Sequence, residues 1–250
     1  MSPAAADVLR ALHSDRAADD PLVVPGPWDA ASARVFEEAG FPTLATPSAG
    51  IAASLGYEDG STPPEEMFAA VARIVRAVSV PVTADLEDGY GLAPRELVAR
   101  VLETGAVGLN LEDSDRSGAL KDPREHATWL AEVRAEAGPR LFVNARVDTY
   151  LCGVDDPAAA IERARLYAAA GADCVYPIKA PAAHLPRLCA GIDAPLNALA
   201  LPGGPSLAEL GRLGAARITF GHGLLLRTLR GVAELAGELA GDTAEFRARA

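Results

Sequence analysis

Lysine is nearly absent from this sequence. Lys121 and Lys179 are the two lysines, and the other basic residues are arginines. Acidic residues outnumber basic ones, and the formal net charge at pH 7 is −11. Nucleic acids and anionic membranes attract basic surfaces, so this charge argues against both as partners. An anionic small molecule would have to be bound by local arginines or by a metal ion.

Cysteines and long apolar runs are also scarce. Cys152, Cys174 and Cys189 form no CxxC pair and no Cys/His ligand spacing, which argues against a disulfide framework or a zinc site. No apolar run approaches the ~18 residues of a membrane span. The first twenty residues mix acids and arginines, unlike a signal peptide. We therefore expect a cytoplasmic protein with reduced thiols.

A repeated unit does run through the chain: a short apolar segment, a turn, and a segment rich in Ala, Leu, Arg and Glu. Glycine ends five of the helical segments, and proline stands near several helix starts, as is typical of helix punctuation. The predicted strands are Leu22–Pro25, Thr43–Thr46, Val80–Asp85, Val107–Glu112, Leu141–Arg146, Cys174–Ile178, Leu196–Ala200 and Arg217–Phe220. The predicted helices lie near 30–39, 64–78, 94–104, 124–137, 157–170, 181–190, 206–213 and 222–240, with an extra N-terminal helix over 5–17.

Eight strand–helix alternations in 250 residues predict a (β/α)₈ TIM barrel that occupies residues 1–250 as a single domain. An open doubly wound sheet is the alternative. No GxGxxG follows the first strand, and the Pro202–Pro205 turn comes too late in the chain for a dinucleotide fingerprint. The barrel is therefore the favoured fold.

Polar residues gather at the predicted strand ends, where barrel enzymes carry their chemistry. Strand three ends in Asp85-Leu-Glu87-Asp88, strand four in Glu112-Asp113, and strand five carries Arg146. Converging carboxylates repel one another unless a cation lies between them, and Mg²⁺ is the natural hard cation for such a set. Arg146 adds an anion clamp. These residues favour a Mg²⁺-dependent enzyme that acts on a small carboxylic acid, against a mere set of solvated loop residues.

Four segments together resemble the isocitrate lyase/phosphoenolpyruvate mutase superfamily, in order and at the expected spacing from about Pro25 to Gly221. They are ATPSAGIAASLGYEDG at 45–60, ADLEDGYG at 84–91, GLNLED at 108–113 and VNARVD at 143–148. The resemblance implies the barrel of that superfamily. It also implies an α-oxo or 2-hydroxy acid substrate whose C–C or C–P bond is made or broken through an enolate-like intermediate.

The resemblance assigns roles to individual residues. It implies that Asp85 ligates Mg²⁺ (or Mn²⁺) directly, and that Glu87 and Glu112 hold the metal, often through its waters. Arg146 matches the residue that binds the substrate carboxylate, and Asp59 matches an acid close to the reacting centre. Ser48, Ala49 and Gly50 fall at or beside a backbone oxyanion pocket. We further expect Trp28 to wall the pocket and Asn197 to contact the substrate.

The loop after strand four departs from the known patterns. Isocitrate and methylisocitrate lyases carry a Lys-Lys/Arg-Cys-Gly-His motif there, and phosphoenolpyruvate mutases carry a longer loop with a lysine and an asparagine. This chain has neither motif between Glu112 and Asp122. Residues Ser114–Ser117 could supply a replacement acid or a second clamp, or be ordinary loop residues. Lys179 and His222 stay open too: an anion clamp or Schiff base for the first, a general acid, an oligomer contact or a helix start for the second.

The leading interpretation is a Mg²⁺-dependent C–C lyase of decarboxylase or retro-aldol type acting on a small α-oxo or 2-hydroxy (di)carboxylic acid. A C–P enzyme, such as a phosphonopyruvate or carboxyphosphonoenolpyruvate mutase or hydrolase, is the alternative. A non-catalytic ligand-binding barrel is the third possibility, weakened because the predicted metal and anion residues are all present. The resemblance also implies a homo-oligomer, a dimer or tetramer, in which exchange of the helix around 224–239 between subunits is left open.

Overall fold

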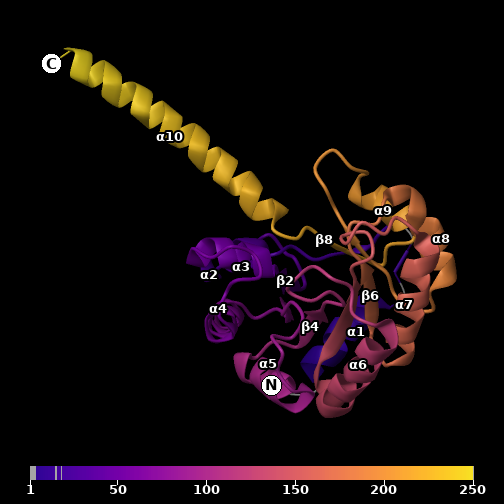
Figure 1. Ribbon diagram of the computed structural model, residues 1–250. Helices are drawn as coiled ribbons and strands as arrows, with labels where there is room; N and C mark the ends of the chain where they lie inside the picture. The colour runs from indigo at the N-terminus through magenta and orange to yellow at the C-terminus, as the bar shows by residue number, and fades with distance from the viewer. Residues whose placement is uncertain (1–3, 15, 18, 250) are drawn as a thin grey trace.

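Eight short strands alternate with helices along the chain in the computed structural model, which describes residues 4–14, 16–17 and 19–249 (Figure 1). The strands are β1 (Leu22–Val23), β2 (Leu44–Thr46), β3 (Val82–Asp85), β4 (Gly108–Leu111), β5 (Phe142–Val147), β6 (Cys174–Pro177), β7 (Asn197–Leu199) and β8 (Arg217–Thr219). The α-helices are α1 (Ala4–His13), α2 (Ala30–Glu38), α3 (Ser48–Leu55), α4 (Pro64–Ala77), α5 (Pro94–Thr104), α6 (Pro123–Ala137), α7 (Pro157–Ala169), α8 (Leu185–Gly191), α9 (Leu207–Arg212) and α10 (Gly223–Arg249). Two short 3₁₀ helices are also present: η1 (Gly138–Arg140) follows α6, and η2 (Ala182–His184) precedes α8.

All strand pairs are parallel. One run has the order β2-β3-β4-β5-β6 and the other β1-β8-β7. Two backbone contacts join the runs: the Ala45 amide donates to the Pro25 carbonyl at 3.1 Å, and a parallel bridge links Val175 with Leu196. The sheet therefore curls round on itself with helices outside, and the predicted (β/α)₈ barrel is confirmed.

The predicted strands all form, with ends that shift by one or two residues. The structure adds α3 directly after β2, in a stretch for which no helix was predicted. Ala-rich Ser48–Leu55 forms two helical turns and stops at Gly56, whose φ of +87° is a left-handed cap. The N-terminal helix is shorter than the predicted 5–17, and the C-terminal helix is longer than the predicted 222–240.

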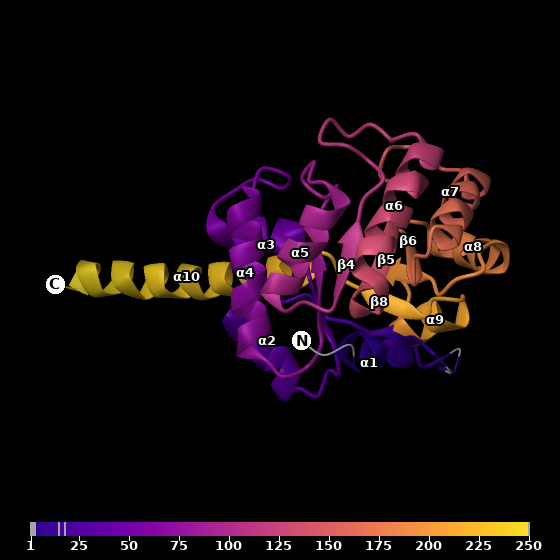
Figure 2. The same cartoon turned by 90° about the horizontal axis from the view of Figure 1, so that it is seen from below.

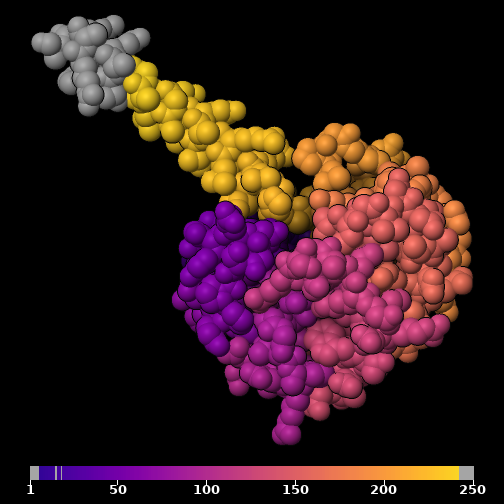
Figure 3. Space-filling model, viewed as in Figure 1, coloured from indigo at the N-terminus to yellow at the C-terminus, as the bar shows by residue number. Residues whose placement is uncertain are grey.

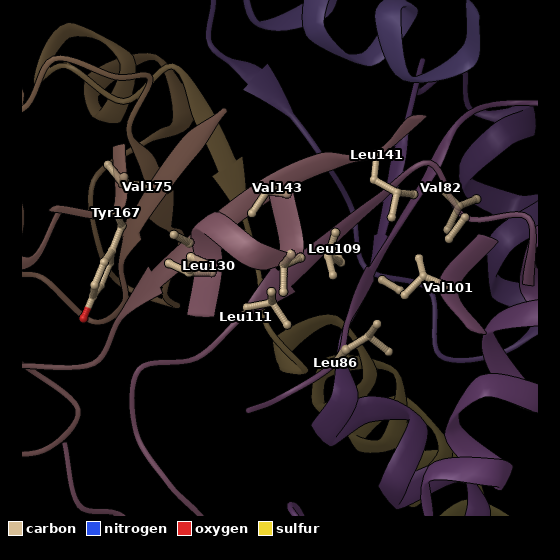
Figure 4. Close-up of a cluster of buried hydrophobic side chains, with 14 of the residues drawn as sticks. Val82, Leu86, Val101, Leu109, Leu111, Leu130, Leu141, Val143, Tyr167 and Val175 are labelled. Carbon is tan, nitrogen blue, oxygen red and sulfur yellow. The ribbon is translucent and has the colours of Figure 1, made fainter. Parts of the chain in front are cut away.

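Two kinds of core follow from strand alternation. Apolar side chains such as Leu109, Leu111 and Val143 face the surrounding helices and are buried there (Figure 4). The barrel interior carries amides instead: Asn144 Nδ2 donates to Asn110 Oδ1 at 2.9 Å and to Asn197 Oδ1 at 3.2 Å. This polar layer links three strands across the barrel and lies beneath its mouth.

Helix α1 packs over the N-terminal ends of the strands. Leu9 joins Phe142 and Cys174 in a small buried cluster, and the His13 ring stacks on Phe142 at 4.4 Å between centroids. Arg10 adds an ion pair to Asp173 at 2.9 Å. One end of the barrel is thereby closed, and the cavity described below lies at the other.

Helix α10 projects away from the barrel in both views (Figures 1 and 2). Its exposed apolar residues include Leu229, Val232 and Leu235, which are spaced three residues apart. Within the described ranges of the chain, no helix combines the length and the apolarity that a membrane crossing requires.

Candidate active site at the carboxyl ends of the strands

A cavity of ≈ 910 Å³ opens at the C-terminal ends of the strands. In Figure 3 the surface is hollowed beside the base of α10. The cavity brings together most of the residues that the sequence analysis selected: Ser48, Ala49, Asp59, Asp85, Glu87, Glu112 and Arg146. A second groove, of ≈ 470 Å³, lies among exposed side chains of α6, α7 and α8 and contains none of them.

Asp85, the last residue of β3, lies at the centre of this group. The Ser48 hydroxyl donates to its Oδ2 at 3.0 Å, whereas its Oδ1 is buried and has no hydrogen-bond partner in the described part of the chain. Burial raises the pKa of Asp85; the Arg146 charge opposes this and the Asp59 charge adds to it. An unsatisfied buried carboxylate oxygen is costly unless a cation or a proton joins it.

Glu87 follows two residues later with a left-handed backbone, φ +53°. The Glu112 amide donates to the Glu87 carbonyl at 2.8 Å, which ties the ends of β3 and β4 together and holds this conformation. Glu87 Oε1 is buried and likewise lacks a partner among the residues described. Burial, reinforced by the charges of Asp85 and Asp59, raises the pKa of Glu87 to about 7.

Arg146 on β5 is held by two carboxylates. Its Nε and Nη2 lie 2.6 and 3.0 Å from the two oxygens of Asp148, and its Nη1 pairs with Glu112. Burial works against the guanidinium charge, but Asp148 and Glu112 outweigh it, so the pKa of Arg146 is raised and the group stays charged. A guanidinium has five N–H groups, so one N–H on each Nη atom is left for a ligand.

Asp148 is a site residue that the sequence analysis did not select. It is fully buried, and the Ser114 hydroxyl donates to its Oδ2. Its amide in turn donates to Asp113 Oδ1 at 2.7 Å. Alternation was the available signal, because Asn144 and Arg146 share one face of β5 and Asp148, the first residue after the strand, continues their spacing of two. Asp148 fixes the plane of the Arg146 guanidinium.

The first turn of α3 faces the same cavity through Ser48 and Ala49. The first amides of a helix have no partner within the helix and carry the positive end of its dipole. The Ser48 amide donates to Asp85 Oδ2 at 3.5 Å, and the oxyanion pocket implied by the resemblance stays a prediction. Gly50, the next residue, does not line the cavity. It packs against the Pro47 ring, which a Cβ at this position would meet at 2.8 Å.

Two predicted substrate contacts do not reach the cavity. Asn197 is the first residue of β7, and its fully buried amide bonds across the barrel interior to Asn144 and to Thr219 Oγ1, the latter at 2.9 Å. Trp28 lies five residues beyond β1 and packs beside Gly50 of α3. Leu199, at the other end of β7, lines the cavity in place of Asn197.

The loop after β4 is short and bonded to itself. Asp115 accepts from the Ser117 amide at 2.8 Å and from the Ala119 amide at 3.1 Å, so its carboxylate organises the loop. Ser114 is occupied by Asp148. Arg116 lines the cavity and lies over the Tyr90 ring, 5.9 Å from its centroid. Lys179 and His222 also line it, both exposed.

No group of three or more Asp, Glu, His or Cys side chains among the described residues is arranged to hold a metal ion unaided. Glu112, one of the three predicted ligands, is paired with Arg146. Mg²⁺ commonly uses one or two carboxylates, with waters and substrate completing its shell. The unpartnered oxygens of Asp85 and Glu87 fit that requirement.

The fold and the position of the cavity define the class of protein: a (β/α)₈ barrel with its candidate site at the carboxyl ends of the strands, as in barrel enzymes. The phosphoenolpyruvate phosphomutase family model matches residues 9–240. The chain belongs to this family, and the resemblance to the isocitrate lyase/phosphoenolpyruvate mutase superfamily is confirmed.

Similar proteins carry several descriptions. An uncharacterized protein of Mycobacterium tuberculosis is 36% identical over 203 residues, which are 80% of this chain and 78% of that one. An oxaloacetate decarboxylase of Ectopseudomonas mendocina is 34% identical over 172 residues, 63% of this chain and 58% of the other. A Burkholderia cenocepacia structure, provisionally described as a phosphonomutase, superposes with a TM-score of 0.88 at 38% identity and covers 95% of this chain and 100% of its own.

Proposed function

We propose that the protein is a Mg²⁺-dependent lyase that breaks or makes a C–C bond of a small α-oxo or 2-hydroxy (di)carboxylic acid through an enolate-like intermediate. The observation that carries this proposal is the pair of buried, unpartnered carboxylate oxygens of Asp85 and Glu87 in one cavity with Arg146. A divalent cation satisfies the first two groups, and a substrate carboxylate satisfies the third.

Asp85 is the residue proposed to hold Mg²⁺ or Mn²⁺, with Glu87 and Glu112 supporting it. When bound, the ion supplies Lewis acidity to the substrate oxygen on which negative charge develops. The hydrogen bond from Ser48 at 3.0 Å fixes one Asp85 oxygen, and the other, which has no partner among the described residues, would be available to hold a cation. Burial of both carboxylates strengthens their attraction for a positive charge.

Arg146 is proposed to bind the substrate carboxylate through its two remaining N–H groups. Because Asp148 grips the guanidinium at two points, its plane is fixed before substrate arrives, which lowers the cost of orienting the acid. The amides at the start of α3 are proposed to stabilise the developing oxyanion. Asp59, which is exposed at the cavity wall, is proposed as an acid close to the reacting carbon.

A C–P bond enzyme is the second candidate. It is supported by the family description and by the provisional description of the Burkholderia structure. The loop after β4 weakens this candidate, because it lacks the lysine and asparagine of the mutases. It equally lacks the cysteine motif of the isocitrate and methylisocitrate lyases, so the first candidate is a lyase of decarboxylase or other retro-aldol type.

Turnover of a substrate panel separates the candidates. We expect Mg²⁺-dependent pyruvate release from at least one of oxaloacetate, 2-methylisocitrate and citramalate-like acids, and loss of that activity in EDTA and in Asp85→Ala. Turnover of phosphonopyruvate alone would favour the C–P enzyme. Activity that survives EDTA, or that is unchanged in Asp85→Ala, would contradict the proposal for both chemistries. Failure to bind oxalate as well as every panel member would favour a barrel of another function.

A further inference from the structure

The two halves of the cavity wall differ in charge. Six acidic lining residues and two arginines, Arg116 and Arg146, come from the first 150 residues of the chain; the acids are Asp59, Asp85, Glu87, Asp88, Glu112 and Asp115. From residue 151 onward the described lining contains no acid and four basic side chains, Lys179, His222, Arg227 and Arg230. This separation exists in a protein with a net charge of −11, so the basic half is a local feature and not a consequence of composition.

The basic residues lie at the carboxyl ends of β6 and β8 and at the start of α10. Lys179 follows β6 by two residues, and Arg227 and Arg230 share one face of α10 at i,i+3 spacing. Within the described chain, none of these three has a hydrogen-bond or ion-pair partner. Lys179 also has a left-handed backbone, φ +59°, a conformation that costs a lysine free energy and that is common at ligand sites.

Apolar side chains line the same half of the cavity and include Ile178, Leu199, Phe220 and Leu224, all of them half-buried. The whole cavity, at ≈ 910 Å³, lies at the upper end of the roughly 300–1,000 Å³ found for sites that hold drug-sized ligands. A four-carbon acid bound by Asp85 and Arg146 would leave most of this volume empty.

We propose that the β6–β8 half of the cavity is a second subsite, which binds an apolar chain and a distal carboxylate on the substrate. The substrate class is then a 2-oxo or 2-hydroxy acid with an extended apolar spacer and a second carboxylate at its far end. Lys179 and Arg227 bind that distal carboxylate, and Ile178, Leu199 and Phe220 contact the spacer. This inference rests on the proposed function, since the near end of the molecule occupies the site of Asp85 and Arg146.

Calorimetric titration in the presence of Mg²⁺ tests the subsite with probes of known length. The probes are oxalate, 2-oxoglutarate, the eight-carbon diacid 2-oxosuberate, and the eight-carbon monoacid 2-oxooctanoate. We expect 2-oxosuberate to bind about tenfold or more tightly than either 2-oxoglutarate or 2-oxooctanoate. Lys179→Met and Arg227→Ala are each expected to weaken the affinity for 2-oxosuberate about tenfold, as the loss of a charge-assisted hydrogen bond does. The affinity for oxalate should not change in either variant.

Arg212→Ala is the matched control, because Arg212 is an exposed arginine on α9 that does not line the cavity. Thermal melts of all three variants confirm that they are folded. Equal affinity for 2-oxosuberate and 2-oxooctanoate, or unchanged 2-oxosuberate affinity in both cavity variants, would overturn the distal carboxylate site while oxalate binding left the proposed function standing. If oxalate itself failed to bind, the proposed function would fall, and the subsite with it.

Discussion

Lys179 and Glu87 share an unusual backbone: both line the cavity and both are left-handed, with φ of +59° and +53°. For an L-residue other than glycine this conformation costs roughly 1–2 kcal/mol. Glu87 is kept there by the backbone bond from Glu112, which joins two strand ends. At both positions the chain gives up stability in order to place a charged side chain at the mouth of the barrel.

Replacing Lys179 by glycine should therefore stabilise the fold. We expect Lys179→Gly to raise the free energy of unfolding by roughly 0.5–1 kcal/mol, because glycine adopts positive φ without strain. Urea denaturation measures the change. Ala180→Gly, at the next position, where φ is not positive, should lower it by a similar amount. A lower free energy of unfolding in Lys179→Gly would contradict the strain argument.

The positions of strand-end residues were predictable from the sequence where the predicted strand ends match the observed ones. Asp85, Glu112 and Arg146 stand at or next to the last residue of their strands and do meet in one cavity. Asn197 was misplaced because β7 begins with it, so its side chain joins the interior layer two residues below the strand end. The basic residues of α10 could not be assigned, since only tertiary packing brings that helix to the mouth.

The turn after β3 shows how one element positions the candidate site. Gly89 has φ +84°, and a Cβ there would lie 2.8 Å from the Trp129 ring of α6. Gly91 has φ +69° but faces open space. The first glycine is therefore required both for its backbone angle and for the close approach of α6, the second for its angle alone.

These two glycines make a matched pair of variants. We expect Gly91→Ala to destabilise the protein by roughly 1 kcal/mol through backbone strain, and Gly89→Ala to cost roughly 1–3 kcal/mol more, because the tryptophan must move as well. Urea denaturation of both proteins gives the comparison. An equal loss of unfolding free energy in the two variants would show that the Trp129 ring moves aside without destabilising the protein.

Helix α1 introduces a pH dependence through His13. Its Nδ1 lies 2.7 Å from the Leu9 carbonyl oxygen and must donate, and its buried Nε2 has no partner in the described structure. Burial, reinforced by the Arg217 charge, lowers the pKa of His13 to about 4, below the 6.5 of a free histidine. Between pH 6.5 and 4, His13 is therefore protonated in the unfolded chain but stays neutral in the folded protein.

Stability that depends on neutral His13 is present above pH 6.5 and is lost as the pH falls towards 4. When the pH is lowered from 7.5 to 5, we expect the free energy of unfolding to fall by about 2 kcal/mol more in the wild type than in His13→Phe. Urea denaturation at the two pH values gives this difference. Buried carboxyl groups with raised pKa, such as Glu87, have the opposite pH dependence, but they are present in both proteins and cancel. Equal losses in the two proteins would contradict the burial of a neutral imidazole.

The last helix, α10, carries exposed apolar residues that the packing of a single barrel leaves uncovered. The helix extends beyond the body of the protein, and Leu229, Val232 and Leu235 are each about half exposed along it (Figures 1 and 2). An apolar stripe of this kind is normally covered. A second copy of the chain is the occupant we expect, in keeping with the homo-oligomer that the resemblance implies, although the sequence could not show how far the helix leaves the barrel.

Light scattering after size-exclusion chromatography tests this expectation. The wild type should elute as a dimer or larger assembly, and Leu229→Glu should shift it towards the monomer, because a charge in an apolar contact is costly to bury. Gly237→Glu places the same charge off the stripe, because residue 237 is not at i,i+3 or i,i+4 spacing from any of the three apolar residues and a Cβ there meets nothing within 4 Å; it should leave the assembly unchanged. A monomeric wild type, or a Leu229→Glu protein of unchanged mass, would contradict the assembly.

The proposed function requires one cavity to join a cation held by Asp85 to an acid held by Arg146. Calorimetric titration of oxalate with and without Mg²⁺ measures this coupling without turnover, since oxalate resembles the enolate of a 2-oxo acid. We expect oxalate to bind in Mg²⁺, to lose its affinity in EDTA, and to lose it in Asp85→Ala even at saturating Mg²⁺. Oxalate that binds equally well in EDTA, or to Asp85→Ala, would contradict the proposed function.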